Sequence, residues 1–292
     1  MLLLSYWLSP KKRVLTLLSN QAQKMFHPTS GRCINIAMDL GIFGARAFSQ
    51  GIEDLPSAFA TIAGAKPDVI QVNPGGLRTL RDAGLSGSVT VALRLDVTNV
   101  YEPRVVEKAW DIAHPNTLTD AEDPSVGCVV LNLLEVDNDA QLQEQCIRNI
   151  QEIGALARAR GISLMIEPLV MTSNSEGGSS SVSDPERIAT LVRQAVELGA
   201  DIIKVDPVEP MERFREVVDI AYPIPVLVRG GGKVTTRQLL ERTKIAMDVG
   251  ASGVVYGRNV VQHPDPASLI AALVAIVHDG ATVDDALALV KE

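Results

Sequence analysis

Residues 197–207 read ELGADIIKVDP, and the rest of the chain is interpreted outward from this stretch. The glycine at position 199 is the kind of residue that ends a helix. The letters IIKV that follow form a short, mostly β-branched apolar run, which is typical of a strand buried on both faces in a parallel α/β sheet. The stretch therefore predicts a helix-to-strand connection in an α/β fold, with one lysine, Lys204, inside the strand.

Lys204 has two interpretations. Burial disfavours a charged ammonium group and lowers the pKa of a lysine, and a neutral amine can attack a carbonyl and form a Schiff base. In the alternative, Lys204 lies at the strand end, where its side chain reaches solvent or pairs with Asp201 or Asp206. The alternative is favoured for a lone lysine, so the choice depends on what the other strands carry.

The alternation of strand and helix repeats along the chain. Strands are expected at residues 33–38, 68–72, 89–95, 128–133, 163–166, 202–207, 226–229 and 253–256. Helices are expected at residues 11–26, 53–65, before 83, 139–160, from 183, at 211–221, 235–249 and up to 290. This pattern predicts a single α/β domain, a (β/α)8 TIM barrel over residues 31–292, after an N-terminal extension and helix in residues 1–30. A doubly wound open sheet is the alternative.

Two segments break the pattern. Residues 96–126 are rich in Pro, Asp and Asn, and we expect a long active-site loop there. Residues 172–182 are rich in Ser and Gly, and we expect a flexible loop after the fifth strand.

The composition limits the class of protein. The chain is 46% apolar and 21% charged, which suffices for a large core. Its net charge of −8 argues against nucleic acid and anionic membranes as partners. Three cysteines (Cys33, Cys128 and Cys146) and four scattered histidines lack metal-ligand spacing, so we expect reduced thiols, a cytoplasmic location and neither a metal nor another cofactor.

The first eight residues are apolar but too short to span a membrane and lack a preceding basic region. Their side chains, among them Leu2, Leu3, Leu4, Tyr6 and Trp7, form an apolar patch that a monomer rarely exposes. This patch predicts a homo-oligomer.

In a barrel of this kind, the carboxyl ends of all strands face one shared mouth. The residues expected at these ends are Asp39, Asn73, Arg94 or Asp96, Asn132, Glu167, Lys204, Arg229 and Arg258.

The last two strands are followed by glycine loops, RGGGK at residues 229–233 and GRN at residues 257–259. Glycines let backbone N–H groups approach phosphate oxygens closely, and phosphate binding after strands seven and eight is a recurrent use of this fold. The loops predict a substrate phosphate bound by Arg229, Gly230, Gly231, Gly257 and Arg258, with tight structural turns as the alternative. Two such loops also favour the Schiff-base interpretation of Lys204.

Two strand-end carboxylates, Asp39 and Glu167, could supply proton transfer, because carbon–carbon cleavage through a Schiff base needs a group that takes a hydroxyl proton. Alternatively, Asp39 binds backbone amides and Glu167 is a salt-bridge partner. An ion pair between Glu167 and Lys204 would raise the lysine pKa and oppose attack on a carbonyl, so we do not expect that pair at rest.

An ordered set of motifs carries a family resemblance: MFHP at 25–28, IAMD at 36–39, GIED at 51–54, ADIIK at 200–204, GGGK at 230–233 and GASG at 250–253, with GRN at 257–259. From about residue 11 to 280 the chain resembles the class I aldolases related to deoxyribose-phosphate aldolase, and within them the archaeal-type fructose-bisphosphate aldolases and the autoinducer-2 aldolase/thiolase branch. The resemblance implies Lys204 as the Schiff-base lysine, Asp39 as an active-site carboxylate and the glycine loops as phosphate ligands.

The chain also departs from that family. Leu40 stands where a histidine is common, and Glu167-Pro168-Leu169 stands where the archaeal enzymes carry a tyrosine acid. The Glu-Pro pair at this point is more similar to tagatose-bisphosphate and sulfofructose-phosphate aldolases. We therefore expect a metal-independent aldehyde-lyase that reversibly cleaves a phosphorylated ketose through Lys204, with Glu167, or else Asp39, as the proton-transfer group. The alternatives are a thiolase- or transferase-type enzyme of the same fold and an inactive phosphosugar-binding protein.

Overall fold

A closed parallel barrel organises the molecule. The computed structural model describes residues 15–43, 46–101, 110–112, 117–137, 139–175 and 178–291. The barrel strands are β1 (Cys33–Ala37), β2 (Val69–Val72), β3 (Thr90–Arg94), β6 (Val126–Val136), β7 (Ser163–Ser173), β9 (Ile202–Val205), β10 (Val226–Arg229) and β11 (Gly253–Tyr256). Each pairs in parallel with the next, and β11 pairs with β1, which closes the ring. The predicted (β/α)8 barrel is confirmed.

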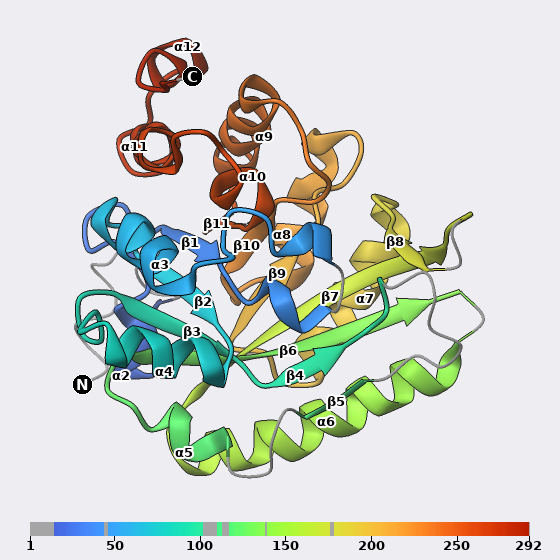
Figure 1. The fold of residues 1–292 in the computed structure, drawn as a ribbon. Coiled ribbons are helices and arrows are strands. Elements are labelled where there is room, and N and C mark those ends of the chain that lie inside the picture. The colour runs from blue at the N-terminus through green and yellow to red at the C-terminus, as the bar shows by residue number, and fades with distance from the viewer. Residues whose placement is uncertain are drawn as a thin grey trace, which may run out of the picture.

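Helices connect the strands and cover the outside of the barrel (Figure 1). The longer ones are α3 (Leu55–Gly64), α4 (Pro74–Asp82), α6 (Ala140–Ala159), α7 (Pro185–Glu197), α8 (Phe214–Ala221), α9 (Thr236–Asp248) and α11 (Pro266–Val277). The shorter ones are α2 (Asn20–Gln23), α5 (Thr117–Ala121), α10 (Arg258–Val261) and α12 (Val283–Leu287), with 3-10 turns η2 (Leu40–Phe43), η3 (Arg46–Phe48) and η4 (Met211–Arg213). Asp184 caps α7 by accepting hydrogen bonds from the N–H groups of Glu186 and Arg187, and Pro185 is the first residue of that helix.

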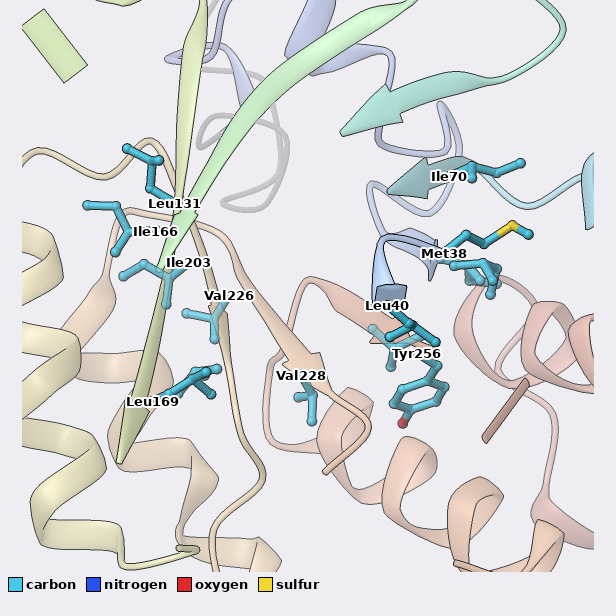
Figure 2. Close-up of a cluster of buried hydrophobic side chains, with 14 of the residues drawn as sticks. Met38, Leu40, Ile70, Leu131, Ile166, Leu169, Ile203, Val226, Val228 and Tyr256 are labelled. Atoms are coloured by element: carbon cyan, nitrogen blue, oxygen red, sulfur yellow. The ribbon is translucent and has the colours of Figure 1, made fainter. Parts of the chain in front are cut away.

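Every second side chain of each strand points outward and packs against the helices. Figure 2 shows part of this outer core, where Leu131, Ile166, Ile203 and Val226 come from four neighbouring strands. Inward positions, most of them in the amino-terminal halves of the strands, form a second apolar cluster inside the barrel. Its strand members are Cys33, Ala37, Val69, Ala92, Cys128, Val130, Met165, Ile202, Leu227 and Val255.

The segment before β1 closes this end of the barrel, because Leu18, Ala22, Met25 and Phe26 belong to the same inner cluster. The predicted continuous helix over residues 11–26 is wrong within the described residues: a turn precedes Ser19, whose hydroxyl caps the four-residue α2. The break comes at Ser19 because its side chain accepts a hydrogen bond from the N–H of Ala22, which begins a new helix at this point. Residues 11–14 lie outside the described residues.

Strands β6 and β7 are longer than predicted and stay paired from Cys128↔Ser163 to Val136↔Met171 (Figure 1). The end of β7 then turns back into β8 (Ser179–Ser181), which pairs antiparallel with it. The predicted loop at residues 172–182 is therefore partly a hairpin.

The predicted loop at residues 96–126 likewise contains regular structure. Its described residues include β4 (Asp96–Thr98), which pairs antiparallel with β5 (Trp110–Ile112), and α5. Ladder hydrogen bonds between two parts of this segment override the turn-forming composition that predicted a loop.

Candidate active site

A cavity of about 50 Å³ opens at the carboxyl ends of the strands. Its lining contains all of the residues that the sequence singled out for the site: Asp39, Glu167, Lys204, Arg229, Gly230, Gly231, Gly257 and Arg258. Two other strand-end residues, Arg94 and Asn132, are almost fully buried and do not line it. Asn73 also lies apart from it and caps α4 by accepting a hydrogen bond from the N–H of Gly76.

Lys204 lies on β9 with 4% of its surface exposed. Its Nζ is 2.8 Å from Oε2 of Glu167 and donates a longer hydrogen bond, 3.4 Å, to Oε1 of Gln71. Burial lowers the pKa of Lys204 below its ordinary value; Glu167 opposes this shift and the charge of Arg94 adds to it. The amine is thus held in a site that disfavours its charged form.

The ion pair between Lys204 and Glu167, which the sequence argument disfavoured, is present, so that expectation is wrong. Glu167 is shared among three cations, because it also contacts the guanidinium groups of Arg94 and Arg229. Burial raises the pKa of Glu167, but these cations outweigh it and lower the pKa to about 2. Burial outweighs the attraction of Glu167, and Arg94 adds to the effect of burial, so the pKa of Lys204 stays lowered despite the pair.

Arg94 is the centre of a buried ionic cluster. Its Nε donates to Oδ2 of Asp39 at 2.6 Å, its Nη1 donates to Oδ1 of Asp96 at 2.9 Å, and its Nη2 donates to Glu167. Asp96 in turn accepts a 2.7 Å hydrogen bond from the backbone N–H of Asn132. Desolvation makes such clusters poor sources of stability. What this one does is hold Asp39 and Glu167 in fixed orientations at the mouth.

Three polar residues of this region were not assigned to the site from sequence: Gln71, Tyr101 and Asp206. Gln71 donates to Oδ2 of Asp39 at 2.7 Å and so links that carboxylate to Lys204. As the only polar residue of the VIQV run of β2, it carried a signal that could have found it. Asp206 pairs with Arg229 Nη1 at 3.0 Å, not with Lys204.

Tyr101 lines the same cavity, and its hydroxyl accepts a 3.2 Å hydrogen bond from Arg229. Its ring is held by edge contact with Phe43 and by Phe48, at centroid distances of 5.3 and 5.2 Å. Tyr101 lies in the segment predicted as a loop, and no periodic pattern in that segment predicted that its side chain would line the cavity.

The two glycine loops meet at the side of the cavity. Gly231 has a φ of +60°, which favours glycine. A Cβ on Gly257 would lie 3.2 Å from the carbonyl oxygen of Ala37. Asn259 ties the loops together by donating to the carbonyl of Gly232.

The guanidinium of Arg258 stands 4.4 Å from the ring centroid of Phe48 and forms no ion pair within the part of the chain that the structure describes. Burial, together with the charge of Arg229, lowers the pKa of Arg258. A partly buried cation beside close-approaching backbone suits an anionic group of a ligand.

The described ranges contain neither a cluster of side chains that could hold a metal ion nor a helix that could cross a membrane. No group of three or more His, Cys, Asp or Glu side chains there is arranged to hold a metal ion. No helix among those residues has the length and hydropathy needed to cross a membrane.

Comparison with known proteins identifies the family of this chain. Residues 33–263 match the model of the DeoC/LacD family of aldolases. A protein of Saccharolobus solfataricus named as an uncharacterized aldolase is 31% identical over 264 residues, which are 89% of this chain and 95% of that protein. A class 1 fructose-bisphosphate aldolase of Halobacterium salinarum is 44% identical over 121 residues, 41% of this chain and 46% of that enzyme.

Among solved structures, a Schiff-base-forming fructose-1,6-bisphosphate aldolase superimposes with a TM-score of 0.73 at 24% identity, over 89% of this chain and 100% of that one. This likeness shows the shared fold. The family match covers most of the barrel and includes the strands that carry Asp39, Glu167 and Lys204. The chain belongs to the DeoC/LacD family of aldolases.

Proposed function

We propose that this aldolase reversibly cleaves a phosphorylated ketose through a Schiff base on Lys204. The observation that carries the proposal is the buried amine of Lys204, with a lowered pKa, in one cavity with both glycine loops and Glu167. An imine-forming lysine needs its neutral form to attack a carbonyl, and burial favours that form. The class 1 fructose-bisphosphate aldolase relative supports a phosphorylated sugar as the substrate class.

The amine attacks the ketone carbon, and the resulting carbinolamine loses water to give an iminium ion. A base then takes the proton from the hydroxyl on the departing carbon. The carbon–carbon bond breaks, its electron pair forms an enamine with the iminium group, and the aldehyde leaves. Protonation of the enamine carbon and hydrolysis return the free amine and the ketone product.

Glu167 is the proposed base for the substrate hydroxyl, with Asp39 as the alternative. The three neighbouring cations lower the pKa of Glu167 to about 2, which keeps it a carboxylate at neutral pH, the form that a base needs, but also makes it a weak base. It lies 2.8 Å from Lys204 Nζ, so it is within reach of groups attached to the imine carbon. Asp39 lines the same cavity, and the guanidinium of Arg94 that holds Glu167 also holds Asp39, so both carboxylates are fixed at the mouth.

The phosphate of the ketose is proposed to bind at Gly230, Gly231 and Gly257, with Arg258 and Arg229 as cations. Arg258 is the better placed of the two arginines, because Arg229 already pairs with Asp206 and Glu167. Inorganic phosphate should therefore compete with substrate.

Borohydride reduction during incubation with phosphorylated ketones and ketoses tests the proposal. The expected product is a covalent adduct on Lys204, located by peptide mass spectrometry, and Lys244→Arg on the exposed face of α9 is the matched control. A transferase-type enzyme would instead need an acyl acceptor for turnover, and a binding protein would give no adduct. Absence of an adduct with the whole panel would contradict the proposed function.

The proposed homo-oligomer rests on Leu2, Leu3, Leu4, Tyr6 and Trp7, which lie outside the described residues. Light scattering tests it. A monomer at micromolar concentration would refute the proposal.

A further inference from the structure

The proposed reaction needs a proton donor for its last step. After the aldehyde leaves, the enamine carbon must gain a proton before water can release the ketone. At rest, Glu167 has a pKa of about 2, is ionised at neutral pH and has no proton of its own to give. Asp39 is paired with the guanidinium of Arg94, a partner that favours the charged carboxylate. A third group of the cavity is therefore needed as the donor.

Tyr101 carries the only hydroxyl group among the described residues that line the cavity around Lys204. Burial raises the pKa of Tyr101 above its ordinary value, and the charge of Arg229 opposes this shift. The nearby carboxylates of Asp206 and Glu167 raise it further. The hydroxyl therefore keeps its proton at neutral pH, which is the form that a proton donor needs.

The hydrogen bonding of Tyr101 leaves its own hydrogen free. A guanidinium can only donate, so the 3.2 Å bond from Nη2 of Arg229 ends on the phenol oxygen. The described residues supply no acceptor for the phenol hydrogen. Because Tyr101 is a wall of the reaction cavity, a substrate bound there can take this place.

Tyr101 is also connected to the reacting amine. Arg229 links the phenol to Glu167, because its Nη2 contacts the phenol oxygen and its Nε lies 3.2 Å from Oε1 of Glu167. The other oxygen of Glu167 is 2.8 Å from Nζ of Lys204. The phenol and the amine thus line one cavity of only about 50 Å³, and an imine on Lys204 has its carbons near Tyr101.

We propose that Tyr101 is the acid that protonates the enamine carbon, and that Arg229 stabilises the phenolate left behind. This inference rests on the proposed function, because it takes the enamine on Lys204 as the intermediate. The guanidinium already contacts the oxygen on which negative charge develops, and Asp206 holds it there through a 3.0 Å ion pair. Tyr101 acts after the carbon–carbon bond has broken, whereas Glu167 acts before.

The protons balance within one turnover. Glu167 takes the proton of the substrate hydroxyl, the carbon–carbon bond breaks, and its electron pair stays in the enamine as the aldehyde leaves. The O–H proton of Tyr101 then passes to the enamine carbon, which restores an iminium ion. The phenolate regains a proton from Glu167, because the carboxylic acid is the much stronger acid of the two. Water hydrolyses the iminium ion, and both groups are back in their resting forms.

Rapid-quench kinetics of Tyr101→Phe tests the inference. The substrate is the phosphorylated ketose that gives the most adduct in the borohydride panel. Phenylalanine keeps the ring packed against Phe43 and Phe48 and removes only the hydroxyl. The first turnover should still release aldehyde rapidly, because cleavage precedes protonation. Steady-state turnover should then fall by about 10²- to 10⁴-fold, the range for a missing acid–base group. Glu167→Gln should show no rapid release, because Glu167 acts before cleavage.

Deuterium exchange measures the same proton transfer in reverse. In D₂O the wild type should place deuterium on the phosphorylated ketone that it traps best, starting from dihydroxyacetone phosphate, as detected by mass spectrometry. Tyr101→Phe should lower this exchange rate by about 10²- to 10⁴-fold. Tyr256→Phe is the matched control, because its hydroxyl is also buried but bonds to Thr243 at 2.7 Å outside the cavity. The control should match the wild type, and all these variants should still trap the ketone with borohydride.

The outcomes separate the two proposals. If the wild type traps no ketone, the proposed function itself fails. If trapping is normal but Tyr101→Phe exchanges deuterium and turns over like the wild type, Glu167 returns its own proton to the carbon and this inference is wrong. If Tyr101→Phe loses the rapid release of aldehyde or traps less ketone, the hydroxyl acts before cleavage or by holding Arg229, and the inference is likewise overturned.

Discussion

The two ends of the barrel are built from the same strands but differ completely in chemistry. Toward the amino-terminal ends, the inward residues are apolar and pack against Met25 and Phe26 of the preceding segment. Toward the carboxyl ends of six strands, the next inward positions are charged or polar: Gln71, Arg94, Asn132, Glu167, Lys204 and Arg229. On β9 the pair is Ile202 and Lys204, and on β7 it is Met165 and Glu167.

Because inward positions recur every second residue, a step of two residues along a strand passes from a packed core to an ionic site. The apolar end gains stability from burial and can tolerate no charge. The ionic end gains little stability from its buried pairs, yet Arg94, Gln71 and Glu167 hold Lys204 and Asp39 in one arrangement. The comparison predicts that changes at the two ends affect different measurements.

The largest effect is expected from Lys204→Arg. Arginine keeps a positive charge beside Glu167 but cannot form an imine, so turnover should fall below detection and no borohydride adduct should form. Circular dichroism and thermal unfolding should show a folded protein. Substantial turnover by this variant would contradict a Schiff base on Lys204.

The next largest effect is expected from Glu167→Gln, with a loss of about 10²- to 10⁴-fold in turnover, the usual range for a missing acid–base group. The variant should still give a reducible adduct. Asp39→Asn should have the milder effect. If Asp39→Asn abolishes turnover and Glu167→Gln does not, the roles of the two carboxylates must be exchanged.

Glu167→Gln should also change how the rate of adduct formation depends on pH. The neutral, reactive form of Lys204 increases as pH rises through its pKa, so the rate of adduct formation should rise with pH through a value below the ordinary lysine pKa. Glu167 raises the pKa of Lys204, and its removal should move this rise to lower pH. A shift to higher pH in Glu167→Gln, measured by trapping rates across pH, would contradict the electrostatic account.

Much of this arrangement could be predicted from sequence, and particular residues show where prediction stops. Strand periodicity and glycine loops placed Lys204, Glu167, Arg229 and Gly257 at one mouth, because residue type and strand position are local signals. The contact between Gln71 and Lys204 joins residues 133 positions apart, and no local pattern encodes it.

The hairpins were missed for a related reason. Pro168 and the serines that follow are typical of a loop, yet β7 runs through Pro168 to Ser173 and pairs with both β6 and β8. Similarly, the prediction that Glu167 and Lys204 do not pair considered only these two residues. The actual consequence of the pair depends on Arg94 and Arg229, which come from two other strands.

A smaller effect, and one on stability only, is expected from Met25→Ala at the apolar end. Met25 is fully buried, and a Cβ on the adjoining Gly127 would lie 2.7 Å from its side chain. Truncating a buried methionine typically costs about 2–5 kcal/mol of unfolding free energy. Chemical denaturation should show this loss, while KM and the turnover of the remaining folded enzyme stay unchanged. A changed KM would mean that the two ends are coupled.

The smallest effect is expected from Arg258→Ala at the ionic end. Arg258 packs on Phe48 and forms no ion pair within the described residues, so its removal leaves no carboxylate unpaired there and the fold should persist. Losing one charge-assisted phosphate contact of roughly 1.5–3 kcal/mol should raise KM about 10- to 150-fold, with a smaller change in kcat. Inorganic phosphate should inhibit the wild type competitively and the variant much less. Arg237→Gln, an exposed arginine outside the cavity, controls for charge. If KM and phosphate inhibition both match the wild type, the glycine loops are structural turns.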